Sequence, residues 1–543
     1  MGNSLKVVME WIDLFIKKEN RLYNMLSDIY GEDLELIEER IFAYLSVLKL
    51  FADTYGPDRK VVIARAPGRI NIMGKHIDHR GGYVNVMAVN KEVIIVASAR
   101  CDDCIKAVDF NPVFGKRAFD IKDYFGKGYP SDWMDYIESE EVAEAVSKQK
   151  GDWINYIKGA VLRLQYEYKD EQLKGMDMAL YGNIPVSAGL SGSSAVVVCT
   201  AEAFMALNKR SIKPERFVEL CGEGEWYVGV RNGISDPASI KLAKKGMVVK
   251  LGFLPFHFEK TYCFPEGYKL IIANSYVKAD KSGSAKDGYN GRVATYEFGL
   301  MLLKKMHPQY ADMIGQIRDI NTDTLGINLI GIYNLILSLP EKISPDELFK
   351  LLPKEDHSKI NRLLSTHNPY RYYYIRAVVM YGIAECHRAK LCEGLLEAGS
   401  INEFGDFMNI SHNGDRVVRY DSNGNSYDYN WSVSEQKLKR LIDDLRSNDN
   451  NRVSNAWIEK QPGGYACSVP EIDYLIDSSL QVKGVIGAQI SGAGLGGCAM
   501  FLAENDSVNE LLSKITDKYY RIKGLKPDIS VCVPVSGSCV ISL

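Results

Sequence analysis

Three glycine-rich segments of the chain combine small residues and hydroxyl groups in a way that suits phosphate chemistry. The central segment, GNIPVSAGLSGSSA, spans residues 182–195 and directly precedes an apolar run at 196–204 that predicts a helix. Glycines allow the backbone to approach a ligand closely, and the first N–H groups of a helix have no partners within it. A phosphate there gains these donors and the positive end of the helix dipole. No Gly-Lys-Ser/Thr sequence closes the segment, so it is not a Walker loop, and by itself it could equally form a tight turn.

The two other segments lie far away on either side. The first, APGRINIMGKHIDHRGG, spans residues 66–82 and is rich in charged side chains. The second, ISGAGLGGC, spans residues 490–498 close to the C-terminus. A glycine-rich loop beside a C-terminal strand can be a plain hairpin. This last segment therefore indicates phosphate binding only in combination with the other two.

In this order and at these separations, the three segments resemble the motifs of the GHMP kinases, which include galactokinase, homoserine kinase, mevalonate kinase and phosphomevalonate kinase. The segment 66–82 narrows the resemblance to the galactokinase branch. Further matches to that branch are Tyr227–Asp236, Tyr289–Arg292 and Phe404–Arg416. The resemblance extends from about residue 50 to the C-terminus. It implies an α+β fold of two lobes, a ribosomal S5-like N-terminal lobe and a ferredoxin-like C-terminal lobe, with the active site in the cleft between them.

Composition excludes several other classes of protein. A formal net charge of −3 over 543 residues provides no basic excess to replace the counterions of a nucleic acid. No apolar stretch approaches the roughly 20 residues that cross a bilayer. The 11 cysteines show no paired spacing, and the chain opens without a signal-peptide pattern. We therefore expect a cytoplasmic protein with a small-molecule substrate, no nucleic acid and no membrane partner; its oligomeric state stays open.

The elements that position the motifs divide the chain into three parts. Residues 1–60 predict helices, because apolar residues such as Ile37, Ile41 and Tyr44 recur at helical spacing. This extension could pack on the rest of the chain or mediate oligomer contacts. Residues 61–262 are the expected N-terminal lobe and residues 263–543 the C-terminal lobe. Strands are expected at 61–64, 93–97, 247–251, 268–273, 486–490 and 498–502, a helix at 152–164, a lobe boundary at 253–265 and an insertion at 306–370.

The resemblance implies that ATP and Mg²⁺ take part. The residues expected to bind the nucleotide are Pro185, Ser187, Gly189, Leu190, Ser191, Gly192, Ser193, Ser194 and Gly494. Ser193 aligns with the family's magnesium-binding serine. The family's second magnesium ligand, a glutamate, aligns with Gly224, so Glu223 or Glu225 could take its place with a small shift in register. Both could equally decorate a helix surface.

Asp236 and Arg69 are the expected catalytic pair, because Asp236 aligns with the catalytic aspartate of the sugar-kinase branch. A guanidinium is always charged, so Arg69 could hold this carboxylate ionised and neutralise the transferring phosphoryl group. Without the resemblance, Arg69 would be a structural salt-bridge partner and Asp236 a helix N-cap before Pro237.

Lys75 governs the expected choice of sugar. Galactokinases carry a glutamate at this position, facing the C6 end of the sugar; a lysine would favour a C6 carboxylate by ~1.5–3 kcal/mol. This motif resembles that of galacturonokinases, so the resemblance implies phosphorylation of the anomeric hydroxyl of D-galacturonic acid. Lys75 could instead reach solvent or pair with Asp78. The expected substrate-binding residues are Lys75, His76, Asp78, Arg231, Gly233 and Tyr289.

Three other functions remain open at the level of sequence. A galactokinase acting on galactose would tolerate Lys75 as a bystander. A related kinase could act on glucuronic acid or another sugar. A non-catalytic sugar sensor would require a degraded phosphate loop or a missing base, whereas Arg69, Ser193 and Asp236 are all present.

Overall fold

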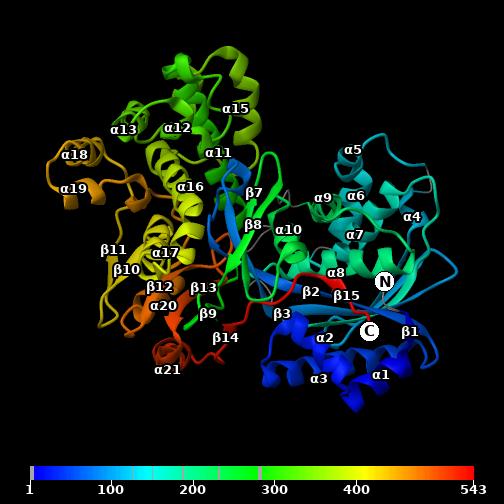
Figure 1. Ribbon diagram of the computed structural model, residues 1–543. Coiled ribbons are helices and arrows are strands. Elements are labelled where there is room, and N and C mark those ends of the chain that lie inside the picture. Colours follow the sequence, from blue (N-terminus) through cyan, green and yellow to red (C-terminus); the bar gives the residue numbers. More distant parts are fainter. Residues whose placement is uncertain (1–4, 126–127, 150, 186–188, 230–232, 279–283) are drawn as a thin grey trace.

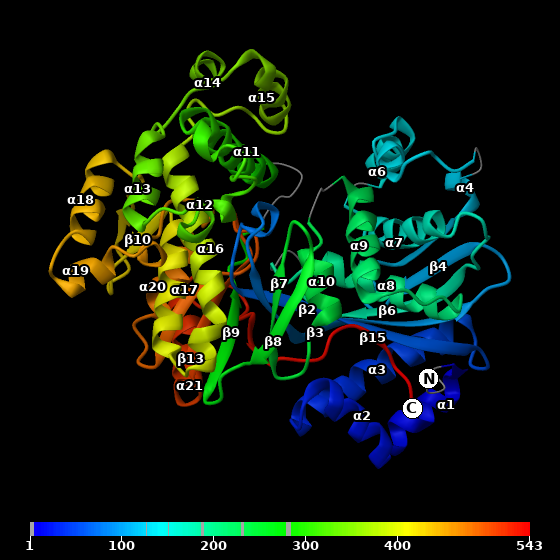
Figure 2. The same cartoon turned by 45° about the horizontal axis from the view of Figure 1, so that its top comes forward.

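The computed structural model describes residues 5–125, 128–149, 151–185, 189–229, 233–278 and 284–543. Figure 1 shows two bodies: one is built on a large sheet covered by helices on both faces, and the other combines a smaller sheet with long helices. The turned view of Figure 2 shows the same two bodies side by side, with strands β7 (Met247–Gly252) and β8 (His257–Cys263) near their junction.

Nine strands of the described chain form the large sheet, in the order β1-β2-β3-β6-β4-β5, with β15 added to β2, β7 to β3 and β8 to β7. Its pairs are antiparallel except β4 with β6. The remaining strands are β1 (Lys6–Val7), β2 (Lys60–Met73), β3 (Val84–Ala99), β4 (Cys104–Asp109), β5 (Lys116–Asp120), β6 (Met176–Gly182) and β15 (Cys539–Val540).

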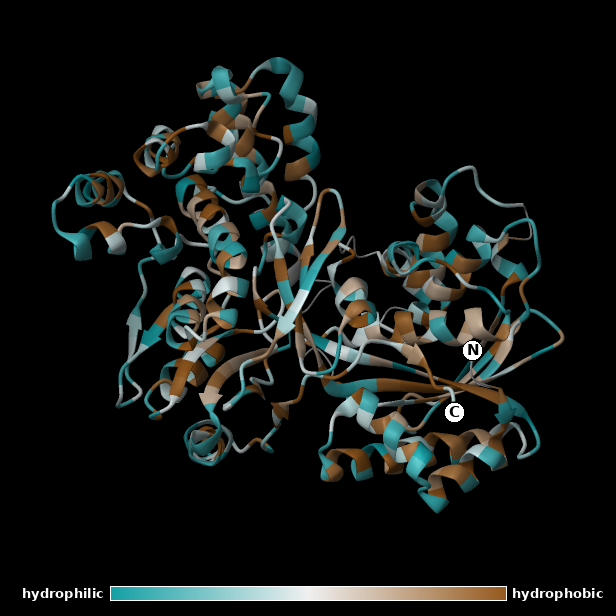
Figure 3. Cartoon of the chain, viewed as in Figure 1, coloured by the Kyte–Doolittle hydropathy of each residue, from teal (hydrophilic) through white to brown (hydrophobic). Residues whose placement is uncertain are grey.

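Both faces of this sheet are buried, so its strands are apolar on both sides. In β2, Val62 and Ala64 pack towards α7 (Ile154–Glu167) and α8 (Gly192–Leu207), whereas Val61 and Ile63 belong to the core on the opposite face. This alternation follows from the two-residue period of a strand. The long strands of the sheet are correspondingly brown in Figure 3.

The N-terminal helices cover the second face of the sheet. They are α1 (Val8–Lys17), α2 (Asn20–Tyr30) and α3 (Leu34–Tyr55), and Asp33 caps α3 by accepting hydrogen bonds from the backbone N–H groups of Glu35 and Leu36. Ile37, Ile41 and Tyr44 are buried in one core with the strands, as their spacing predicted. The expectation that this extension is helical and packs on the rest of the chain is therefore confirmed.

The second body contains a four-stranded antiparallel sheet in the order β12-β13-β9-β14. Helices α20 and α21 share one apolar core with this sheet, and α16 and α17 share another. The bounds are β9 (Tyr268–Asn274), β12 (Val485–Ile490), β13 (Cys498–Glu504), β14 (Ile529–Cys532), α16 (Ile375–Glu397), α17 (Ile401–Asp415), α20 (Pro470–Ser479) and α21 (Val508–Ile515).

A third group of helices packs around α11 (Ser284–Met306) and α16. It includes most of segment 306–370, whose helices are α12 (Thr322–Leu325), α13 (Leu329–Ser338), α14 (Pro345–Leu351) and α15 (His357–Leu364), and it also includes α18 (Glu435–Leu445). Among the described residues, no helix has the length and apolar content needed to span a bilayer.

The predicted division near residue 263 coincides with a change of sheet, since β8 still pairs with β7 and β9 begins the smaller sheet. Strand β8 itself falls inside the predicted boundary at 253–265, where no strand was expected. The predicted C-terminal lobe also does not stay apart, because the end of the chain returns and β15 pairs with β2 in the first sheet.

Candidate active site

Asp236 and Arg69 meet although 167 residues separate them in the sequence. Arg69 lies on β2, and Asp236 lies in the first turn of α10 (Ser235–Leu242). The Nε and Nη2 groups of Arg69 both lie 2.6 Å from Oδ1 of Asp236. The Ser191 hydroxyl donates to the other carboxylate oxygen at 2.5 Å. The N-cap of α10 is Ile234, so the alternative role of Asp236 as an N-cap is wrong.

The phosphate loop packs directly against this pair. Nη1 of Arg69 donates to the carbonyl oxygen of Gly189 at 2.8 Å. The backbone N–H of Arg69 donates to the carbonyl oxygen of Leu190 at 3.1 Å. Ser191 is the N-cap residue of α8, so the unpaired N–H groups of this helix begin at Gly192. The arrangement brings the start of α8 next to the carboxylate of Asp236.

The third glycine-rich segment closes on the phosphate loop from the second body. Gly189 has φ +73°, and a Cβ built there would lie 2.5 Å from the carbonyl oxygen of Ser491. Only glycine allows so close an approach of the two loops. Gly494 packs against Cys467, while Pro185 is half-buried at the entrance of the phosphate loop. The two loops therefore form one wall contributed by both bodies.

The structure separates the two candidate glutamates for magnesium. Glu223 accepts a hydrogen bond from Nε of Arg163 at 2.5 Å and also pairs with Arg216, so its charge is already matched. Glu225 is buried, with only 2% exposed. Burial, and after it the charge of Glu225, raises the pKa of Tyr156, whereas the hydroxyl of Ser193 acts to lower it. Ser193 and Glu225 thus lie around one tyrosine, and they suit a cation that takes few protein ligands.

Asp78, Gly233 and Tyr289 lie together beside the catalytic pair. Asp78 accepts a hydrogen bond from the Ser235 hydroxyl at 2.8 Å, and its other oxygen lies 3.1 Å from Nδ1 of His79. Burial raises the pKa of Asp78, but these hydrogen bonds outweigh burial and hold the pKa below its usual value. A Cβ on Gly233 would lie 3.4 Å from the Asp78 carboxylate. Burial, together with the charges of Asp78 and Asp236, raises the pKa of Tyr289.

Lys75 does not have the environment that the sequence suggested. It is buried, with 2% exposed, and its Nζ donates to Oδ2 of Asp415 at 3.0 Å. Nε2 of His76 lies 3.3 Å from the other oxygen of Asp415. Both alternative roles of Lys75, an exposed side chain and a partner of Asp78, are therefore wrong. Its positive charge is matched by Asp415, on α17 of the second body, which sequence reasoning did not single out.

Sequence reasoning also missed a run of aromatic and imidazole rings that joins these groups. The ring centre of His79 lies 6.0 Å from the ring centre of Tyr289 and 6.1 Å from the ring centre of Tyr296. Tyr465 lies 5.6 Å from Tyr296 and stacks on His76 at 4.2 Å. The hydroxyls of Tyr296 and Tyr465 and the Nε2 atom of His79 are buried without a hydrogen-bond partner among the described residues. Of these rings, His76 and Tyr289 were expected at the site from the sequence, whereas His79, Tyr296 and Tyr465 were not.

Three of the residues expected at the site from the sequence remain: Ser187, Arg231 and Ser194. Ser187 and Arg231 lie outside the described residues. Ser194, at the start of α8, is buried, and its hydroxyl has no hydrogen-bond partner within the described part of the chain.

Family models match three parts of the chain. The model of the GHMP kinases N terminal domain matches residues 155–244, the galactokinase galactose-binding signature matches 49–99, and the GHMP kinases C terminal model matches 431–521. The galactokinase of Roseiflexus sp. is 25% identical over 474 residues, covering 87% of this chain and 90% of its own. The galactokinase of Dictyostelium discoideum is 24% identical over 533 residues, which cover 95% of this chain and 97% of that protein.

The crystal structure of Lactococcus lactis galactokinase complexed with galactose superposes with a TM-score of 0.61. The match covers 91% of this chain and 98% of that one, at 21% identity. The fold is therefore the GHMP kinase fold with its N- and C-terminal domains. The chain is similar to GHMP kinases over the matched segments, and its galactose-binding signature and the two relatives above are those of galactokinases.

Proposed function

We propose that the protein is an ATP-dependent sugar kinase that phosphorylates the anomeric hydroxyl of a galactose-type sugar. The observation that carries this proposal is the geometry of Asp236, which Arg69 and Ser191 fix directly beside the start of α8. A base near a phosphate-binding helix terminus is what phosphoryl transfer to a hydroxyl requires. The intact pair weighs against a non-catalytic sugar sensor.

The two oxygens of Asp236 have different tasks. Oδ1 accepts hydrogen bonds from both the Nε and Nη2 groups of Arg69, which orients the carboxylate. Oδ2 accepts one hydrogen bond from Ser191 and retains a second lone pair. The sugar hydroxyl donates to this lone pair and transfers its proton there as its oxygen bonds to the γ-phosphorus. The bond from that phosphorus to the bridging oxygen breaks, and ADP leaves with the electron pair.

The protein supplies the remaining stabilisation through fixed groups. The N–H groups at the start of α8 and the glycine loops at Gly189 and Gly492 are positioned to bind the nucleotide phosphates. Ser193 would hold Mg²⁺ together with Glu225, which is buried and whose charge acts on Tyr156, a residue that also interacts with Ser193. Bound magnesium would neutralise charge on the phosphates.

Three features favour a neutral sugar. The charge of Lys75 is matched by Asp415, so little of it is left to attract a sugar carboxylate. The buried hydroxyls of Tyr296 and Tyr465 and the imidazole of His79 can exchange hydrogen bonds with uncharged hydroxyl groups. Asp78, held ionised, can accept from ring hydroxyls and would repel a carboxylate.

D-Galacturonic acid is the second candidate substrate, because Lys75 stands where the resemblance leads us to expect a glutamate. ATP consumption with galactose, galacturonate, glucose and glucuronate separates the two. We expect galactose to be the preferred substrate. Preference for galacturonate, lost in the charge-balanced double variant Lys75→Met/Asp415→Asn, would instead identify a sugar-acid kinase.

The Asp236→Asn variant tests the mechanism. Replacing the base removes proton transfer while preserving the size of the side chain, so turnover should fall by about 10²–10⁴-fold. Binding of ATP, measured by calorimetry, should stay nearly unchanged. Asp170→Asn is a matched control, since Asp170 is exposed. An Asp236→Asn enzyme that retains near-normal turnover would remove Asp236 from the role of base.

A further inference from the structure

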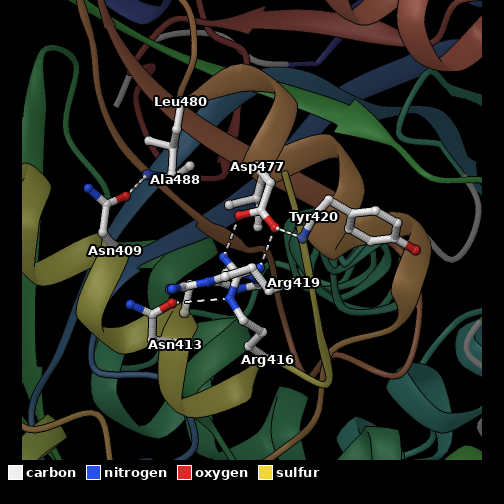
Figure 4. A pocket seen from close by; sticks show the side chains of 10 residues that line it. Asn409, Asn413, Arg416, Arg419, Tyr420, Asp477, Leu480 and Ala488 are labelled. Carbon is white, nitrogen blue, oxygen red and sulfur yellow. Dashed lines mark hydrogen bonds and ion pairs between the residues drawn. The ribbon is translucent and has the colours of Figure 1, made fainter. Parts of the chain in front are cut away.

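A cavity lies in the C-terminal body, between the end of α17, α20 and the hairpin strand β10 (Val418–Tyr420). Its volume is about 190 Å³, enough for a molecule of a few heavy atoms. Figure 4 shows Arg416, Arg419, Asn413 and Asp477 around this cavity. None of the residues assigned to nucleotide, sugar or base lines it, so it is separate from the proposed active site.

Arg416 forms the fixed floor of the cavity. Its Nη1 and Nη2 groups donate to the two oxygens of Asp477 at 2.7 and 2.8 Å. Its Nε donates to Oδ1 of Asn413 at 3.1 Å. This pairing uses most donors of Arg416 and also fixes the amide of Asn413, whose Nδ2 group makes no hydrogen bond with the described residues.

Arg419 adds a cation that is free of any carboxylate in the described chain. It is exposed and lines the cavity. The ring of Tyr429 lies 5.6 Å from its guanidinium carbon and 5.9 Å from that of Arg416. This aromatic surface helps to order Arg419 before any ligand binds. The guanidinium of Arg419 and the amide of Asn413 therefore present hydrogen-bond donors to one small space.

His412 supplies one buried acceptor to the same cavity. It is fully buried, and its Nε2 lies 3.0 Å from the carboxylate of Asp473. Burial lowers the pKa of this imidazole, so it is neutral at neutral pH. Both ring nitrogens are buried without a hydrogen-bond partner among the described residues; because Nε2 faces the Asp473 carboxylate, a neutral ring is best accommodated with its proton on Nε2 and its lone pair on Nδ1.

We propose that this cavity binds a small hydroxylated anion, a carboxylate or a phosphate monoester. The anionic oxygens would receive the donors of Arg419 and Asn413, and a hydroxyl group of the ligand would donate to Nδ1 of His412. A donor-rich rim with one deep acceptor is complementary to that combination of groups. The site assigned here does not depend on the proposed kinase reaction.

Calorimetric titration with three probes of similar size tests the site: D-glycerate, glycerol 3-phosphate and glycerol. A non-hydrolysable ATP analogue and galactose are present throughout, so that anions do not bind at the phosphate loop. We expect at least one of the anions to bind more tightly than glycerol. Tighter binding of D-glycerate would identify a carboxylate as the recognised group, and tighter binding of glycerol 3-phosphate would identify a phosphate.

Two variants assign the binding to this cavity. Arg419→Ala removes an exposed cation, and Asn413→Asp keeps the acceptor for Arg416 while replacing the free donor with a negative charge. Each variant should lower the affinity for the more tightly bound anion by about tenfold or more. This is the loss expected when a charge-assisted hydrogen bond is removed. Arg446→Ala, an exposed arginine outside the cavity, is the control and should bind normally. Anions that bind no better than glycerol, or that bind equally well to Arg419→Ala and Asn413→Asp, would overturn the proposal.

Discussion

At the scale of single residues, the pair Lys75 and Asp415 explains how a lysine is accommodated inside the sugar-binding motif. Both side chains are almost completely buried. Burial alone would raise the pKa of Asp415, but the charges of Lys75 and His76 outweigh it and hold that pKa below its usual value. The two charges are thus mutually dependent, and a change to one alone leaves the other uncompensated.

Asp415→Asn should therefore cost ~3–5 kcal/mol of unfolding free energy, because it strands a buried ammonium group. The double variant Lys75→Met/Asp415→Asn should recover most of this loss and still phosphorylate the preferred sugar. Denaturant titration of the wild type and of both variants measures the effect. Equal stability of the single and double variants would show that the two charges do not interact.

The same pair predicts a pH dependence. The pKa of Asp415 in the folded protein lies below that of an unfolded aspartate, about 3.9, so its contribution to stability is complete at neutral pH. This contribution is lost as the pH falls below about 4 towards the folded-state pKa. The double variant should lose less stability than the wild type over this acidic range, as followed by thermal unfolding at each pH.

At the scale of elements, segment 306–370 braces the loop that carries the sugar-binding motif. Arg318 donates to the carbonyl oxygens of Gly81 at 2.9 Å, Phe253 at 2.7 Å and Leu254 at 2.5 Å. Glu297 of α11 pairs with both Arg80 and Lys359. The segment therefore holds the motif residues from outside the site, although it contacts none of the catalytic groups.

Arg318→Ala should raise the KM for the sugar several-fold and change kcat less, because the loop that orders Asp78 and His79 loses its hydrogen bond at Gly81 and its link to residues 253 and 254. Steady-state kinetics with the sugar varied at saturating ATP separate these two constants. Arg362→Ala, an exposed arginine on α15 of the same segment, is the control and should match the wild type. A fall in kcat at unchanged KM would contradict a positioning role for Arg318.

Local sequence patterns predicted most elements that position the site. The strands expected at 61–64 and 93–97 and the helix at 196–204 are parts of β2, β3 and α8, whose apolar runs are long and regular. Strand β8 was missed because its sequence, HFEKTYC, is largely polar and half-exposed. The partner of Lys75 was missed for a different reason: 340 residues separate Lys75 from Asp415, and no local pattern encodes such a contact.

At the scale of the whole molecule, one buried cluster joins three distant parts of the chain. Glu92 on β3 accepts hydrogen bonds from Arg65 of β2 at 2.6 Å and from Tyr30 of α2 at 2.7 Å, and it lies 3.4 Å from Arg40 of α3. Arg65 also donates to the carbonyl oxygens of Ser536 and Gly537 at 2.8 Å. Accordingly, Figure 1 shows both chain ends on the large sheet.

Glu92→Gln tests whether this cluster holds the N-terminal helices and the returning C-terminus to the sheet. It removes the one carboxylate that serves two fully buried arginines, so the unfolding free energy should fall by ~3–5 kcal/mol, with a lower melting temperature. The KM for the sugar should not change, because Glu92 contacts no residue of the proposed active site. Glu39→Gln is the matched control: Glu39 also pairs with Arg40 but is exposed, and its loss should cost no more than about 1 kcal/mol. If the two variants melted alike, the N-terminal helices and the chain end would be held by apolar packing alone.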